Sequence, residues 1–298
     1  MRLNKNKTTF GRHETFPLRF GWLTKGFEAI KAEPDCFNRP EQAMVTLGIG
    51  RNMVNAMQYW LQAVGVIVVE DGIARPTALG EILLGEQGDR YLEDEATLWI
   101  IHWLLAANAE GATGIYWFFN RYSLPRFYHQ EILRALSEFI EQEIKPGRSG
   151  STLKSEVSTL LRLYAPDVGR SDDHLDSPLA SLRVIEPDSG GYRSQRIMRP
   201  FLPPVVLHFA LAQRFEVEPE AAALPVRSLL YSDADWAAPG AVFRLSEEGL
   251  MATLSKVMDR YPGCYELRDT AGLHQIYRGQ RIPDPLTVLR QHYQGGLV

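Results

Sequence analysis

Cysteine is scarce in this sequence: the two cysteines, Cys36 and Cys264, lie far apart and show no metal-ligand spacing. This argues against a zinc site and fits a reducing cytosol. Long apolar runs are also missing, since none approaches the roughly 18 residues that a membrane span needs. The first ten residues, MRLNKNKTTF, are basic but lack the apolar segment of a signal peptide. We therefore expect a cytoplasmic protein that has no membrane partner.

The compact motifs of common enzyme classes are absent as well. The sequence has no Walker-type glycine loop, no Rossmann fingerprint and no Gly-x-Ser-x-Gly elbow. The histidines are scattered, and no paired Asp and Glu-x-Lys stands out as a nuclease signature. We expect no organic cofactor. If the protein catalyses a reaction, its catalytic residues do not form a compact sequence motif.

Neither sign of charge is in large excess. The formal net charge is −4 in 298 residues, with 45% hydrophobic and 23% charged residues. These proportions are those of an ordinary soluble globular protein, and the length suffices for two domains or three small ones. Because the whole molecule is slightly acidic, any nucleic-acid surface must be a local basic patch.

The stretch from residue 40 to 85 has the pattern of a winged helix-turn-helix. A short apolar segment at 43–47 and a Gly-Ile-Gly turn precede a segment with helical periodicity at 51–64. The β-branched run 66–69, an acidic turn that ends in Gly72, and the short run 73–75 then form a hairpin signal. The apolar positions of the second helix are Met53, Met57, Trp60, Leu61 and Val64.

The opposite face of this second helix is polar. In a winged helix the second helix enters the major groove, where Arg, Asn and Gln can pair with guanine or adenine edges. The alternative is that this is simply the solvated face of a packed helix. The side chains that we assign to DNA on this face are Arg51, Asn52, Asn55, Gln58 and Gln62.

Residues 10–26, FGRHETFPLRFGWLTKG, combine aromatic and charged side chains. Arg12, Arg19 and Lys25 are close in sequence, and we assign them to a basic patch that holds DNA phosphates. His13 and Glu14 could act as an acid/base or metal-binding pair. Alternatively, the aromatic side chains pack together and the charged side chains cover them.

An acidic run, Glu93-Asp94-Glu95, precedes a segment that is apolar nearly all round and should form a buried helix capped by Asp94. Acidic residues at a helix start usually act as caps. The three carboxylates could also bind Mg²⁺ or another divalent cation. We predict a composite catalytic site in which His13, Glu14, Asp94 and Glu95 lie near one another.

A helix followed by a short hairpin recurs along the chain. Amphipathic spacing predicts helices at 127–144, 151–164 and 245–261, and strand-like runs follow at 181–185 and 265–268. A shorter helix is expected at 27–37, before the first winged-helix unit.

These patterns predict a mainly α fold of winged-helix-like units with short β-hairpins. The predicted domains are an N-terminal winged-helix DNA-binding domain with a central buried helix (1–125), a second winged-helix-like helical unit (126–200) and a C-terminal helix-plus-hairpin domain (201–298).

Three segments resemble a bacterial family known as a domain of unknown function. They are FGRHETFPLRFGWLTKG, GIGRNMVNAMQYWLQAVGVI, and YLEDEATLWIIHWLLA with YWFFN. The family pattern usually reads Ser-Gly-His-Glu-Thr-Phe, and this chain keeps His-Glu-Thr-Phe at 13–16 but has Gly11-Arg12 before it. The family is similar to SspB, the DNA-nicking component of the Ssp DNA phosphorothioation system.

The resemblance implies a nickase that binds double-stranded DNA and cuts one strand, so that sulfur can replace a non-bridging phosphate oxygen in a system that takes part in phage defence. It also implies partner subunits: a cysteine desulfurase, an ATPase and an ATP-pyrophosphatase that resembles PAPS reductases. Whether two copies of the chain form a homodimer is left open. Because no nuclease motif is visible, the alternative is a non-enzymatic winged-helix adaptor or regulator that presents DNA to these subunits.

Overall fold

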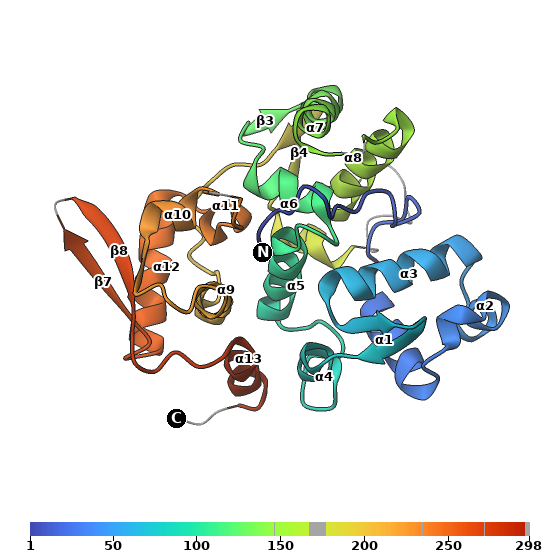
Figure 1. The fold of residues 1–298 in the computed structure, drawn as a ribbon, viewed down its shortest axis with the longest axis horizontal. Helices are drawn as coiled ribbons and strands as arrows, with labels where there is room; N and C mark the ends of the chain where they lie inside the picture. Colours follow the sequence, from blue (N-terminus) through green and yellow to red (C-terminus); the bar gives the residue numbers. More distant parts are fainter. Residues whose placement is uncertain (146, 167–176, 234, 271, 296–298) are drawn as a thin grey trace.

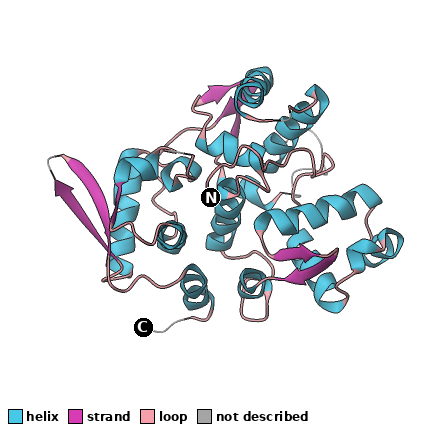
Figure 2. Ribbon diagram, viewed as in Figure 1, coloured by secondary structure: helices cyan, strands magenta, loops and turns pink. Residues whose placement is uncertain are grey.

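The structure, a computed structural model, describes residues 1–145, 147–166, 177–233, 235–270 and 272–295. Its described part consists mainly of α-helices, with three small antiparallel sheets (Figures 1 and 2). This confirms the predicted mainly α class with short hairpins. None of the helices in the described ranges is long and apolar enough to cross a membrane.

The first part of the chain has the predicted order of helix, turn, helix and hairpin. The elements in order are α1 (Trp22–Ala32), the 3₁₀ turn η1 (Cys36–Asn38), α2 (Pro40–Leu47), α3 (Arg51–Val64), β1 (Ile67–Glu70), β2 (Ile73–Pro76) and α4 (Ala78–Leu84). The helix predicted at 27–37 is wrong in its bounds. It starts earlier and ends at Ala32, because the residue before Pro34 is forced into an extended conformation.

The hairpin follows from its turn sequence. β1 and β2 pair with Ile67 opposite Pro76 and Glu70 opposite Ile73. The two connecting residues, Asp71 and Gly72, have φ angles of 51° and 77°, which a type I′ turn requires at both central positions.

Helix α5 (Glu95–Ala107) lies in the middle of the molecule and contacts α3, α6, α9 and α11 (Figure 1). The predicted cap is confirmed, because an Asp94 carboxylate oxygen accepts the Ala96 backbone N–H at 2.8 Å. Helix α6 (Thr113–Asn120) packs on α5 and is itself fully buried. This pair forms the centre of the hydrophobic core.

The next segment packs two helices beside a small sheet. Helices α7 (His129–Glu143) and α8 (Gly150–Tyr164) contact each other, and the 3₁₀ turn η2 (Pro178–Leu182) packs on α8. The strands β3 (Arg126–Phe127), β5 (Gly191–Arg193) and β4 (Glu186–Asp188) form a sheet in that order. The strand predicted at 181–185 is wrong, since residues 181 and 182 belong to η2 and the strand begins at Glu186.

The C-terminal part combines helices with the third sheet. The elements in order are α9 (Pro204–Val217), β6 (Ala223–Pro225), α10 (Val226–Leu230), α11 (Pro239–Val242), α12 (Glu247–Arg260), β7 (Tyr265–Thr270), β8 (Leu273–Arg278) and α13 (Pro285–Tyr293). The sheet order is β6-β8-β7. The last helix, α13, contacts both α9 and α4, and so joins the end of the chain to its first part.

One hydrophobic cluster of buried side chains extends from Leu3 to Leu289 and includes residues of all three predicted domains. The boundaries at 125 and 200 stay predictions, as does the winged-helix character of the first and second units.

Candidate functional site

Two predicted stretches that are far apart in sequence meet at one cleft. The cleft has a volume of about 580 Å³ and lies between α3 and the segment that precedes α1. Asn55, Gln58 and Gln62 line it from α3, and Arg12 and Glu14 line it from the other side. Figure 1 shows the dark-blue N-terminal segment running between α8 and α3. Residues predicted for DNA binding and for catalysis therefore share one concave surface.

The α3 wall results from the helical periodicity of its sequence. Met57, Trp60 and Leu61 are buried, as predicted, and α3 packs against α1 and α2. The polar side chains lie on the other face. Arg51, Asn52, Asn55 and Gln62 are exposed, and Gln58 is half-buried.

The opposite wall is a turn in an unusual backbone conformation. Gly11, Glu14 and Thr15 have φ angles of 72°, 48° and 67°. Glycine adopts this left-handed region readily, but Glu does so seldom and β-branched Thr more seldom still. Such conformations persist only where surrounding contacts enforce them, and they are concentrated at functional sites.

A buried pair of side chains enforces this turn. Glu156 of α8, which is 4% exposed, accepts hydrogen bonds from the Gly11 N–H at 2.7 Å and from His13 Nε2 at 3.1 Å. His13 is 2% exposed, and its Nδ1 accepts the Thr15 backbone N–H at 3.2 Å. Because a backbone N–H can only donate, Nδ1 is the acceptor in this contact and Nε2 is the nitrogen that donates to Glu156. Both ring nitrogens thus hold the turn, and Glu14 beside them lines the cleft.

His13 also joins the turn to α3. Its ring stacks on Trp60, with the ring centroids 6.4 Å apart, and meets Tyr59 edge-on at 6.1 Å. The Trp60 indole N–H donates to the Phe16 carbonyl at 3.0 Å. The two walls of the cleft are therefore connected by a packed aromatic cluster.

Tyr59 adds an aromatic ring to the lining of the cleft. Burial raises the pKa of its hydroxyl well above the ordinary value of 10, and the charge of Glu156 raises it further. The hydroxyl is therefore neutral at physiological pH and can both donate and accept. With the three amides, one cation and one anion, the cleft offers hydrogen-bonding groups rather than a strong field of one sign.

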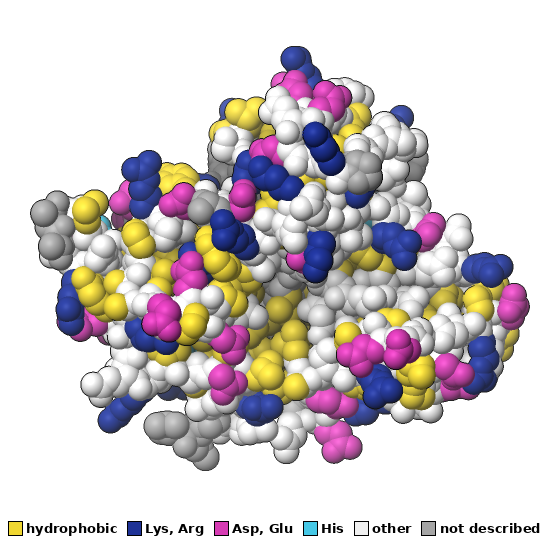
Figure 3. Space-filling view, in the orientation of Figure 1, with side chains coloured by type: hydrophobic (Ala, Val, Ile, Leu, Met, Phe, Trp, Pro, Cys, Tyr) yellow, Lys and Arg dark blue, Asp and Glu magenta, His cyan; other side chains and the backbone are white. Residues whose placement is uncertain are grey.

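The other two residues of the predicted basic patch have local contacts. The Arg19 guanidinium lies over the rings of Phe16 and Trp22, at 5.8 and 5.6 Å from their centroids. Lys25 Nζ donates to the Leu47 carbonyl at 2.6 Å, at the end of α2. On the face drawn in Figure 3, Lys and Arg side chains are interspersed with Asp and Glu. The phosphate-binding role of these residues stays a prediction.

The acidic run at the start of α5 contacts a different part of the chain. One Asp94 carboxylate oxygen caps α5, and the other is 2.6 Å from His292 Nε2 on α13. Glu95 accepts the Trp99 indole N–H at 3.1 Å. His13 bonds to α8 and Asp94 to α13, so the two halves of the predicted composite site belong to separate hydrogen-bond networks. Their cooperation in catalysis stays a prediction.

Within the ranges that the structure describes, no group of three or more His, Cys, Asp or Glu side chains is arranged to hold a metal ion. Glu93 is exposed, and its backbone N–H donates to Asp89 at 2.9 Å. The role of Glu93, Asp94 and Glu95 as metal ligands stays a prediction. A divalent cation held here would need oxygen ligands from DNA or water in addition to protein carboxylates.

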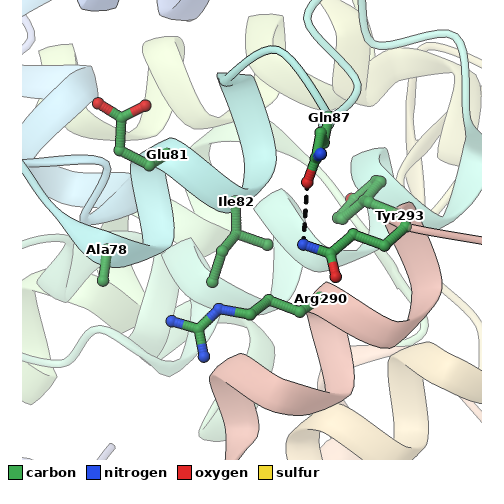
Figure 4. Close-up of a pocket in the computed structure, with 7 residues that line it drawn as sticks. Ala78, Glu81, Ile82, Gln87, Arg290 and Tyr293 are labelled. Atoms are coloured by element: carbon green, nitrogen blue, oxygen red, sulfur yellow. Dashed lines mark hydrogen bonds between the residues drawn. The ribbon is translucent and has the colours of Figure 1, made fainter.

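A second, smaller cavity of about 250 Å³ lies between α4 and α13 (Figure 4). Glu81 and Ile82 line it from α4, and Arg290 and Tyr293 line it from α13. The Gln294 side-chain amide donates to Gln87 at 3.0 Å at its edge. None of the predicted site residues belongs to its lining.

Comparisons with known proteins connect this geometry to a family. The family described as a protein of unknown function, DUF4007, matches residues 10–293. The chain belongs to the DUF4007 family. No curated protein matches this DUF4007 chain.

Two solved structures are similar to this DUF4007 protein over nearly its whole length. An SspB crystal structure matches with a TM-score of 0.84 and 25% sequence identity, and the match covers 98% of this chain and 89% of that one. A magnesium ion-bound SspB crystal structure matches with a TM-score of 0.82 and 22% identity, covering 99% and 98%. The family resemblance seen in the sequence is thereby confirmed.

Glu156 is a residue of the candidate site that sequence reasoning missed. A signal was present, because Leu153, Val157 and Leu160 mark the buried face of α8 and Glu156 lies on that same face. A carboxylate on a buried face needs an internal hydrogen-bond partner. The pattern could have indicated a tertiary contact, although not with which residue.

Proposed function

We propose that this DUF4007 chain is the DNA-binding nickase subunit of a DNA phosphorothioate-modification and phage-defence system, cutting one strand to allow sulfur insertion. The observation that carries the proposal is the likeness to SspB along 98% of the chain, with a TM-score of 0.84. We propose nicking as the activity because the family resembles a DNA-nicking component. The cleft between α3 and the Gly11–Thr15 turn is where the proposal puts the DNA strand.

In this proposal α2, α3 and the β1–β2 hairpin act as a winged helix on double-stranded DNA. The exposed Arg51 and Asn52 on the first turn of α3 approach base edges in the major groove. Arg75, exposed on β2, approaches the backbone from the hairpin. Arg12, together with Arg19 and Lys25, neutralises phosphates.

Strand cleavage requires activation of a water and stabilisation of charge at the phosphate. Glu14 is an exposed carboxylate in the cleft, on the turn that His13 and Glu156 hold, and Arg12 in the same lining can bind a phosphate oxygen. Mg²⁺ is ordinarily held by one or two carboxylates together with substrate phosphates, so Glu14 fits as its protein ligand. The ion would supply charge neutralisation at the scissile phosphate. One of the similar structures is a magnesium ion-bound SspB.

The proposal includes the partners that the family resemblance implies. They are a cysteine desulfurase, an ATPase and an ATP-pyrophosphatase in the cytoplasm, with a homodimer as a further arrangement.

The alternative function is a non-enzymatic adaptor that presents DNA to these partners. One observation favours it: both ring nitrogens of His13 are engaged inside the protein, so this ring is not free to take a proton from water. The adaptor and the nickase share the same DNA surface and differ only in the chemistry.

A plasmid assay tests the proposal. Supercoiled plasmid is incubated with the full chain in Mg²⁺ or in EDTA, and open circles are counted on a gel. We expect nicking in Mg²⁺ and a loss of about 100-fold or more in rate for Glu14→Gln, because the neutral amide is a weaker ligand for the cation and cannot take a proton from water. Glu141→Gln, an exposed residue of α7, is the matched control. A wild-type chain that binds plasmid without nicking it is an adaptor. If Glu14→Gln and Asp94→Asn both nick at the wild-type rate, these carboxylates are structural.

A further inference from the structure

The polar face of α3 is opposed by another chain segment along part of its length. Asn55, Gln58 and Gln62 face Thr9, Arg12 and Glu14 across the cleft, and Gly111 closes it from a third side. A helix that reads a major groove about 12 Å wide must project into it. The residues of α3 that line the cleft begin at Asn55. We call the helix from Asn55 to Val64 its recessed part, because a wall opposite it leaves room for a ligand but keeps this part from entering a groove.

We propose that the cleft holds a single unpaired nucleotide of DNA, with its base against the amides of α3 and its phosphate near Arg12. This inference rests on the proposed function only in taking DNA as the ligand. It adds that the recessed part of α3 binds a nucleotide of one strand. That nucleotide is either extruded from the duplex or lies in a strand that is already separated from its partner.

The side chains in the cleft match a nucleotide. Each amide presents a donor and an acceptor, the combination that base edges also present. Tyr59 offers an aromatic surface and a neutral hydroxyl. A volume of about 580 Å³ lies in the range of small-molecule sites, so it suits one nucleotide and is too small to enclose a duplex.

Hydrogen bonds within the protein hold both walls of the cleft. Glu156 and His13 hold the turn on one side, and the Trp60–Phe16 hydrogen bond ties that turn to α3 on the other. Enzymes that act on a nucleotide inside a duplex commonly extrude it into such a preformed pocket. The position of Glu14 on the rim would then bring a carboxylate to the backbone of the extruded nucleotide.

Binding of the full chain to three labelled oligonucleotides of one sequence tests the inference: a duplex, the same duplex with a central unpaired bubble, and the single strand. 2-Aminopurine in the bubble reports the environment of the unpaired base. We expect the bubble to bind about tenfold more tightly than the duplex, as for one stacked base. The double variant Gln58→Ala/Gln62→Ala should lose this preference for the bubble over the duplex. The matched control, Gln130→Ala/Gln142→Ala on the exposed surface of α7, should keep both the preference and the duplex affinity of the wild type.

Equal affinity of the wild-type chain for bubble and duplex overturns the inference, while duplex binding itself leaves the proposed function standing. A bubble preference that survives in Gln58→Ala/Gln62→Ala overturns it too. The absence of binding to all three DNAs rejects the inference together with the proposed function. Because Gln62 is exposed, Gln62→Ala alone serves as the folded variant if the double variant unfolds, and it should lose part of the preference.

Discussion

Glu156 accepts a hydrogen bond from His13 although the two residues are 143 positions apart in the sequence. The same carboxylate oxygen accepts the Gly11 backbone N–H at 2.7 Å. A side chain of α8 thereby determines the backbone of a turn that lines the cleft on α3. Helix α8 is therefore part of the site, although Glu156 does not line the cleft.

Replacing Glu156 with Ala should destabilise the fold and disorder the turn. The change leaves the N–H groups of Gly11 and His13 without an acceptor, at a cost of about 1–3 kcal/mol in unfolding free energy. Glu156→Gln retains a carbonyl acceptor and should recover most of the loss. Urea unfolding monitored by tryptophan fluorescence measures both variants, with Glu141→Ala as an exposed control. Equal destabilisation by Ala and Gln would show that charge, not hydrogen bonding, is what the site requires.

The first turn of α3 should contribute to specific DNA binding. Replacing Arg51 or Asn52 with Ala should cost roughly 1–3 kcal/mol if either residue makes a bidentate base contact. Both side chains are exposed, so the fold should be unaffected. Fluorescence anisotropy with specific and scrambled duplexes measures the effect. Unchanged affinity in both folded variants would remove this helix from the interface.

The basic residues near the N-terminus should set the salt dependence of binding. Neutralising Arg12 and Lys25 together should lower the slope of log affinity against log salt by about 2, because each phosphate contact releases counterions. The measurement is a titration of duplex DNA at a series of salt concentrations. A slope equal to that of the wild type would mean that these two charges face away from DNA.

Two buried histidines should make stability depend on pH. Burial lowers the pKa of His102 from 6.5 to about 3 and that of His208 to about 4. The unfolded chain takes up protons at both rings near pH 6.5 while the folded chain does not, so stability is complete above this pH and falls as the pH drops below it. Each histidine should cost about 1.4 kcal/mol per pH unit between pH 6.5 and its folded pKa.

Urea unfolding at several pH values measures this effect, and His208→Gln should flatten the curve. A wild-type stability that is constant between pH 7 and about 5 would contradict the prediction, since no proton uptake would then be linked to unfolding.

Features with local causes could be predicted from the sequence. The Asp71-Gly72 turn, the Asp94 cap and the buried stripe of α3 each depend on residues within one or two turns of the chain. The α3 residues that line the cleft followed from the same periodicity. The strand at 181–185 failed because a short apolar run is compatible with both a 3₁₀ turn and a strand.

The rest of the site depends on contacts between distant segments. The left-handed conformation of Glu14 and Thr15 comes from His13 and Glu156, which no local pattern links. Asp94 has a predictable cap but an unpredictable partner in His292. The amphipathic pattern of α3 identified its polar face. That this face lines a cleft could not be predicted, because the opposite wall is formed by the N-terminal segment.

The docking of α13 has a consequence for how the chain reaches its native state. Asp94 and His292, which meet at the start of α5, are 198 residues apart, and Thr97 pairs with Tyr293 across 196 residues. Contacts at such separations slow folding, because a large loop must close before they form. During synthesis the central helix acquires these partners only after α13 has left the ribosome. A nascent chain paused before that point would expose the packing surfaces of α4 and α9 to chaperones.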